Sequence, residues 1–166
     1  MPNTLKDGYS NFAFFQAFLP FATTDPIGAG HDGISIDTKG YETCTFIFNI
    51  GAATGGGAWA ADDFFQLQLE HYNSVAAAWS ECYPSQMIHS VIGEAGAYSA
   101  LNSGIFQSIA SETDCSTLYR VGYIGPHRFV RVGISAELTP SIISVAAICI
   151  CGLPRNWPVN TPVGYP

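Results

Sequence analysis

The sequence carries very little charge for its length. Only 11% of its 166 residues are charged, and Lys and Arg together number six, whereas soluble domains average about 25% charged residues. The formal net charge is −7, so the chain lacks the basic clusters that nucleic acids and anionic membranes attract. We therefore expect no nucleic-acid partner and no membrane partner. The sparse charge instead indicates a surface that another protein covers.

Long apolar runs are also missing. No run reaches the ~20 residues that a membrane-spanning helix needs. The first residues, "MPNTLKDGYSNFAFFQAF", have neither the basic start nor the apolar stretch and small-residue cleavage site of a secretory signal, so we expect none. Apolar residues nevertheless make up 48% of the chain, which is enough for one folded domain with a real core.

The cysteines form no tight framework. Their number is odd and their spacing is wide: Cys44, Cys82, Cys115, Cys149 and Cys151. We interpret them as reduced thiols of a protein made in a cytoplasm. Cys149 and Cys151 are two residues apart in a β-like run and share one face. A metal clip on this pair is one alternative; small buried core residues are the favoured one, and we expect no cofactor and no metal.

Motifs for catalysis are absent as well. "GAATGGG" (residues 51–57) lacks the lysine of a phosphate-binding loop, and no helical pattern follows it. The four histidines show neither H-x-H nor H-x-x-x-H spacing, which disfavours a metal-binding cupin. Asp62 and Asp63 are adjacent, so their side chains diverge in a strand, whereas a glycosidase needs two carboxylates about 5 to 9.5 Å apart across a cleft. No G-x-S-x-G is present. We expect a protein that is not an enzyme.

A period of two residues dominates the chain from residue 34 onward. "TCTFIFNI" (residues 43–50) and "FFQLQLEH" (residues 64–71) alternate apolar and polar residues, as strands with one wet face do. "SIISVAAICIC" (residues 141–151) is apolar on both faces, which predicts a central strand. Residues 97–110 also admit a short helix. Glycine and proline clusters separate these runs, so we predict an all-β, jelly-roll-like sandwich of about eight strands.

The first 30 residues differ from the rest. They hold five phenylalanines that fit neither a clean helical stripe nor a clean alternation: Phe12, Phe14, Phe15, Phe18 and Phe21. Two interpretations stay open, an extended arm that packs on the chain's own core and an arm that docks on a partner or sister subunit. We expect the docking arm, with a sandwich that folds without it. The predicted units are an arm over residues 1–30, the sandwich over 31–160 and a tail over 161–166.

Positive charge is concentrated in "VGYIGPHRFVRVGI" (residues 121–134). Gly125 and Pro126 predict the turn of a hairpin. Arg128 and Arg131 lie in its second strand among apolar residues, so we expect each to pair with a carboxylate on a neighbouring strand. We assign the same structural role to Arg155.

Four segments in this order resemble one known family. They are "IDTKGYETCTFIFNIGA" (residues 36–52), "FFQLQLEHYNSVAAAWSECYPSQMI" (64–88), "VGYIGPHRFVRV" (121–132) and "GLPRNWPV" (152–159). Together they are similar to the capsid decoration, or cement, proteins of tailed bacteriophages, many of which are jelly rolls. The third segment, a Tyr-x-Gly-x-x-Arg-aromatic-Val-Arg block, is the most specific. None of the four is catalytic.

The resemblance implies a structural virion protein that binds the outer surface of an assembled capsid and stabilises the shell. Its partners would be the major capsid protein and further copies of itself, a trimer being preferred to a dimer. It would be made in the host cytoplasm and end on the capsid surface. The alternative is a small tail- or fibre-associated jelly roll that contacts a receptor or a glycan.

Overall fold

The computed structural model describes residues 12–22, 31–54, 59, 64–89, 104–137 and 142–154. These residues form β-strands and two short 3₁₀ turns, η2 (Pro84–Gln86) and η3 (Glu112–Asp114), with no α-helix among them. None of their helical segments has the length and hydropathy to cross a membrane. The strands are β1 (Phe12–Ala22), β2 (His31–Asp32), β3 (Ile36–Asp37), β4 (Tyr41–Thr54), β5 (Phe64–Asn73), β6 (Ala78–Glu81), β7 (Met87–His89), β8 (Ile105–Ile109), β9 (Thr117–Tyr123), β10 (Phe129–Glu137) and β11 (Ile142–Pro154).

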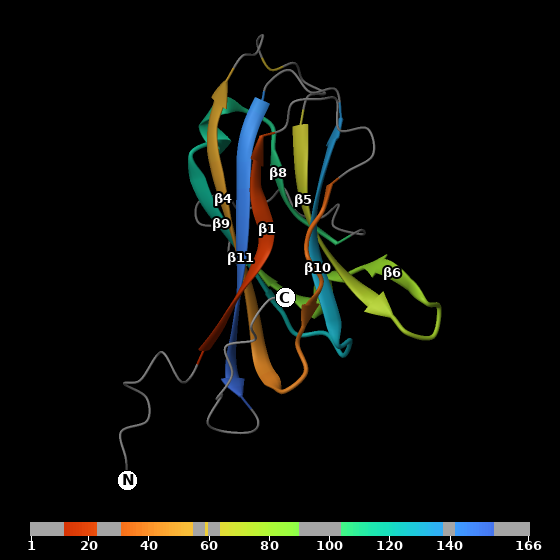
Figure 1. Cartoon of the computed structure of the whole chain (residues 1–166). Helices are drawn as coiled ribbons and strands as arrows, with labels where there is room; N and C mark the ends of the chain where they lie inside the picture. The colour runs from red at the N-terminus through yellow and green to blue at the C-terminus, as the bar shows by residue number, and fades with distance from the viewer. Residues whose placement is uncertain are drawn as a thin grey trace, which may run out of the picture.

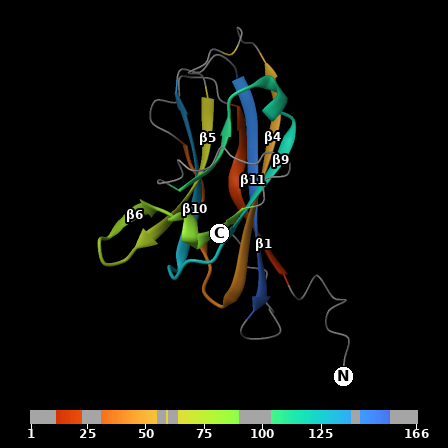
Figure 2. The ribbon, with the colours of Figure 1, turned by 180° about the vertical axis from the view of Figure 1, so that it is seen from behind.

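The strands build two packed antiparallel sheets, the two layers seen in Figure 1 and from behind in Figure 2. The five-stranded sheet has the order β1-β11-β4-β9-β7. The six-stranded sheet has the order β2-β10-β5-β6, with β3 also paired to β10 and β8 to β5. The chain passes repeatedly from one sheet to the other, for example between β4 and β5, between β9 and β10 and between β10 and β11. The protein is thus an all-β, jelly-roll-like sandwich, and its eleven strands exceed the expected eight because several pairings are only two to four residues long.

The core lies between the sheets and follows the predicted alternation. Phe46, Phe48 and Ile50 of β4 face Phe65 and Leu67 of β5, and all five are fully buried. Alternate residues on each strand point outward, so every strand contributes to one inner and one outer face. The predicted central strand is β11, which lies between β1 and β4.

The aromatic N-terminal segment requires a correction. Residues 12–22 are not an arm outside the sandwich, because β1 pairs with β11 from Phe12 opposite Gly152 to Ala22 opposite Ser144. The ladder contains two register shifts, between Gln16 and Phe18 and between Phe18 and Phe21. The expected boundary at residue 30 therefore does not separate this strand from the domain.

The expected hairpin over residues 121–134 is wrong. β9 belongs to the five-stranded sheet and β10 to the six-stranded sheet, so the Gly125-Pro126 segment crosses from one sheet to the other. Of the segment 97–110, which also admitted a short helix, residues 105–109 form strand β8.

Candidate functional site

The outer face of the five-stranded sheet carries large exposed apolar side chains among small and polar ones, and we call it the apolar face. One row of it runs across all five strands, because Phe14 lies opposite Ile150, Ile150 opposite Thr45, Thr45 opposite Gly122 and Gly122 opposite Ile88. The large side chains that are exposed on this face are Phe12, Phe14, Ile88, Leu118 and Ile148, with Phe14 and Leu118 about two-thirds exposed at 65% and 67%. Exposed apolar side chains gathered on one sheet face make it the candidate docking surface of the described residues.

Two details shape the apolar face. Gly152 lets the Phe12 ring lie flat on the sheet, since a Cβ there would come within 2.9 Å of that ring and of Thr43 Oγ1. Toward the β7 edge the face is hollowed by a groove of about 320 Å³. Ile88, Ile124 and the stem of Arg120 line it together with Thr45, so it has an apolar wall with one cation at its rim.

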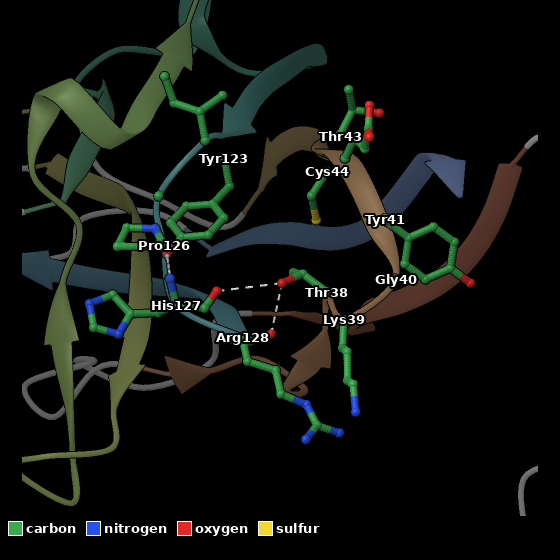
Figure 3. A pocket seen from close by; sticks show the side chains of 13 residues that line it. Thr38, Lys39, Gly40, Tyr41, Thr43, Cys44, Tyr123, Pro126, His127 and Arg128 are labelled. Carbon is green, nitrogen blue, oxygen red and sulfur yellow. Dashed lines mark hydrogen bonds between the residues drawn. The ribbon is translucent and has the colours of Figure 1, made fainter. Parts of the chain in front are cut away.

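A second cavity of about 380 Å³ lies at the end of the sandwich where residues 123–128 cross between the sheets (Figure 3). Thr38 closes one side, because its Oγ1 donates a hydrogen bond to the Arg128 carbonyl at 2.8 Å. Tyr123 closes another, since its hydroxyl oxygen accepts the His127 amide at 3.0 Å. Burial raises the pKa of Tyr123 to about 12, so the phenol stays neutral. Cys44 also lines this cavity.

Three buried thiols meet behind the wall of that cavity, and we call them the thiol cluster: Cys44, Cys149 and Cys151. The Sγ–Sγ distances are 3.1 Å from Cys44 to Cys149, 3.4 Å from Cys151 to Cys44 and 3.7 Å from Cys149 to Cys151. Hydrogen bonds with Cys149 and then Cys44 lower the pKa of Cys151. Hydrogen bonds with Cys151 and Cys44, together with burial, raise the pKa of Cys149.

A cysteine and a histidine also meet, without the properties of a catalytic pair. Cys82 Sγ lies 3.5 Å from His71 Nδ1, and both side chains are buried. Burial, and then the charge of Glu70, raise the pKa of Cys82 to about 12, so the sulfur remains a thiol. Burial, and then the stacked ring of His127 at 3.9 Å, lower the pKa of His71. The described residues therefore hold no activated nucleophile at this position.

The arginines of the 121–134 segment both contact carboxylates. Arg131 of β10 binds Glu70 of β5 through Nε at 2.7 Å and Asp32 of β2 at 2.8 Å, which ties three strands of the six-stranded sheet together. Its guanidinium also lies 4.4 Å from the centroid of the Trp79 ring. Arg128 is more exposed and donates from Nε to Asp37 at 2.8 Å. This hydrogen bond holds the pKa of Asp37 below its ordinary value. Arg155 lies outside the described residues.

The five N-terminal phenylalanines do not share one face. Phe12 and Phe14 lie on the apolar face. Phe15 packs against the core, with its ring 6.2 Å from that of Tyr41 in an edge-to-face contact. Phe18 is a core residue, 5% exposed. Phe21 lies opposite Val145 in the ladder, and its side chain lies outside the described part of the structure.

Sequence reasoning missed two features of the molecule, one on the apolar face and one in the core. Alternation places Ile47, Ile148 and Ile150 outward, whereas the doubly apolar run over residues 141–151 by itself predicts only a central strand. Cys44 was not joined to Cys149 and Cys151, because nothing in the spacing tells which strand lies beside β11.

No protein-family model matches the chain, and no curated protein matches its sequence. One solved structure with a similar course of the chain is the crystal structure of the CBM22-1–GH10 modules of the N-terminal endo-1,4-β-D-xylanase 10B of Clostridium thermocellum, complexed with xylohexaose. The identity is 10% and the TM-score is 0.38. The match covers 95% of this chain and 29% of that chain. A likeness of this size says nothing about what this chain binds.

Proposed function

We propose that this chain is a non-catalytic structural protein of a bacteriophage virion, which docks its apolar face on the outer surface of an assembled capsid and stabilises the shell. The observation that carries the proposal is the apolar face itself, which spans a whole sheet and leaves Phe14 and Leu118 about two-thirds exposed. The resemblance of four segments to decoration proteins supplies the identity of the partner. The low charge of the sequence favours the same role, because interface cores are depleted of charged residues.

The expected free energy of docking is compatible with binding to an assembled capsid in many copies. A standard protein interface buries about 800 Å² on each partner, which is on the scale of one face of a five-stranded sheet. Apolar burial contributes roughly 25 cal/mol per Å², and much of this offsets the entropy of association. A protein that binds only the assembled shell stabilises it by mass action. Many copies, each of moderate affinity, suffice for this purpose.

Self-association would use the same kind of surface. Exposed side chains of β1 and β7 lie at the two edges of the sheet, so neighbouring copies on a shell can cover what the capsid leaves open. We propose a homo-oligomer, with a trimer preferred to a dimer, whose members lie around a symmetry axis of the capsid.

Co-sedimentation with capsids tests the docking surface. The sample is capsid purified from phage that lacks this protein, and the variants are Phe14→Ser and Leu118→Ser. The control is Val75→Ser, which removes an even more exposed apolar side chain, 96% exposed, from the turn between β5 and β6. We expect both apolar-face variants to lose most capsid binding and the control to keep it. Undiminished binding by the two variants would exclude this face as the docking surface.

The outer face of the six-stranded sheet supports a second candidate, a module that binds a glycan. Trp79 and Tyr72 lie opposite each other with ring centroids 5.6 Å apart. Glu70 and Arg131 are beside them, so aromatic surface and charged hydrogen-bonding groups share one patch, as in sites that recognise polar ligands. A glycan array probed with the wild type and with Trp79→Ala tests it. Binding that the variant loses and Val75→Ser keeps would favour this function over the first.

A further inference from the structure

The thiol cluster is assembled by the fold rather than by the sequence. Cys151 of β11 lies directly opposite Cys44 of β4 in the ladder, and Cys149 lies two residues before it on the same inner face. Cys44 lies 105 and 107 residues from its two partners in the sequence, and only the fold brings its sulfur to theirs. Three of the five cysteines of the chain thus converge on one point.

The spacing of the sulfurs matches a metal site. A metal–thiolate bond is about 2.3 Å long, so three sulfurs around one ion in a plane lie about 4.0 Å apart. The three observed distances, 3.1, 3.4 and 3.7 Å, fall below this by a few tenths of an ångström to about 0.9 Å. Small rotations of the thiol side chains therefore suffice to admit an ion. The cluster requires no movement of the strands that carry it.

The composition of the cluster selects the kind of ion. The three residues that come together as ligands are all cysteines, and all are buried. No carboxylate or imidazole of the described residues joins this group. Soft thiolate ligands select Cu(I) and Zn(II) over hard cations. Zn(II) sites are nearly always four-coordinate, whereas Cu(I) is satisfied by three sulfurs.

An entry route to the cluster is present. Of the three cysteines, Cys44 lines the end cavity of about 380 Å³, so this cavity is the route from solvent to the cluster. Each thiol that ligates as thiolate releases one proton, which the cavity passes to solvent.

We infer that Cys44, Cys149 and Cys151 form a binding site for one three-coordinate Cu(I) ion in the core of the sandwich. The ion would cross-link β4 and β11, the longest ladder of the five-stranded sheet. The folded chain holds the three sulfurs together and the unfolded chain does not, so the ion binds the folded chain more tightly and stabilises the domain that carries the apolar face.

Competition for Cu(I) held by the coloured chelator bicinchoninate tests the site in reduced full-length protein without oxygen. We expect the wild type to withdraw one Cu(I) per chain and to melt at a higher temperature with it. Cys151→Ala and Cys44→Ala should lose this binding. Cys115→Ala, which removes another buried thiol outside the cluster, is the matched control and should keep it.

If the cluster variants fold poorly, X-ray absorption at the copper edge of the wild-type protein still identifies the atoms that bind the ion. We expect a first shell of sulfur alone, at about 2.3 Å. Failure of the reduced wild type to take up Cu(I) would overturn the inference. Uptake that is as strong in Cys151→Ala as in Cys115→Ala, or a shell that contains nitrogen, would overturn it as well and leave the three cysteines as core residues.

Discussion

Two phenylalanines of one strand provide a matched test of what β1 does. Phe18 is 5% exposed, and its ring lies 6.3 Å from that of Phe48 in an edge-to-face contact. Phe14, four residues earlier, is 65% exposed on the apolar face. Replacing a core Phe by Ala costs about 3 to 5 kcal/mol. Because β1 is an edge strand that can relax into the space left, we expect Phe18→Ala to lower the free energy of unfolding by about 3 kcal/mol. Phe14→Ala should change it by less than about 0.5 kcal/mol.

Urea unfolding followed by circular dichroism measures the two variants. A domain of this kind has about 5 to 15 kcal/mol of stability in total, so the Phe18 variant should shift the midpoint strongly with an unchanged slope. Phe14→Ala should keep the wild-type midpoint and lose capsid binding. If both variants kept the wild-type midpoint, β1 would contribute nothing to folding, and the strand would be a docking arm after all.

Four further outcomes follow from the same structure. Deletion of residues 1–28 should unfold or badly destabilise the domain, as thermal melting would show, because it removes the whole of β1. Arg131→Ala should lower the free energy of unfolding in urea by about 2 kcal/mol, since it leaves the largely buried Glu70 opposite Glu81 without its cation. Arg128→Ala removes an exposed ion pair and should change the urea midpoint much less. The lowered pKa of His71 means that its imidazole binds a proton less readily in the folded chain than in the unfolded chain. The free energy of unfolding should therefore be full above pH 6.5 and fall as the pH drops below it. A urea midpoint that is independent of pH between about 7 and 5 would contradict this. Light scattering at micromolar concentration should show an oligomer that Leu118→Asp reduces to a monomer.

The sequence predicted the architecture because alternation is a local property. The inward positions of β4 and β5 could be assigned from their letters alone, and the structure buries Phe46, Phe48, Leu67 and Leu69 as the period requires. Pairing between distant strands is not local. The hairpin at Gly125-Pro126 was wrong for this reason, since the same turn chemistry serves a connection within a sheet and a crossing between sheets.

The five phenylalanines show how a bulge defeats a periodic pattern. Phe14 points outward and Phe15 inward, as alternation demands, but Ala17 and Phe18 are both buried. The register shift between Gln16 and Phe18 explains this, because an extra residue in one strand reverses the face of everything that follows it. A strand with such a shift fits neither a helical stripe nor a period of two. The residues that suggested a free arm in fact form a bulged strand.

The candidate surface could be predicted only in part. Sparse charge led us to expect a partner, an expectation that stays a prediction, and the doubly apolar run over residues 141–151 contains the outward-facing Ile148 and Ile150. The sequence does not show which strands flank β11; in the structure they are β1 and β4. The neighbours turn isolated apolar residues into a continuous face, and they also bring Cys44 to Cys149 and Cys151.

If the proposed docking surface is right, folding and docking are coupled through β1. Its inward residues, Phe15 and Phe18, complete the core, and its outward residues, Phe12 and Phe14, extend the apolar face beyond β11. An edge strand also presents unpaired backbone groups to any partner. If β1 detached, the chain would lose core contacts and docking surface at once, while β11 would expose a new edge. A mutation that loosens β1 should thus weaken capsid binding even when it touches no residue of the apolar face. Phe18→Ala separates the two effects, because its capsid affinity should fall with its stability as the temperature is raised. The capsid affinity of Phe14→Ser should instead be low at every temperature.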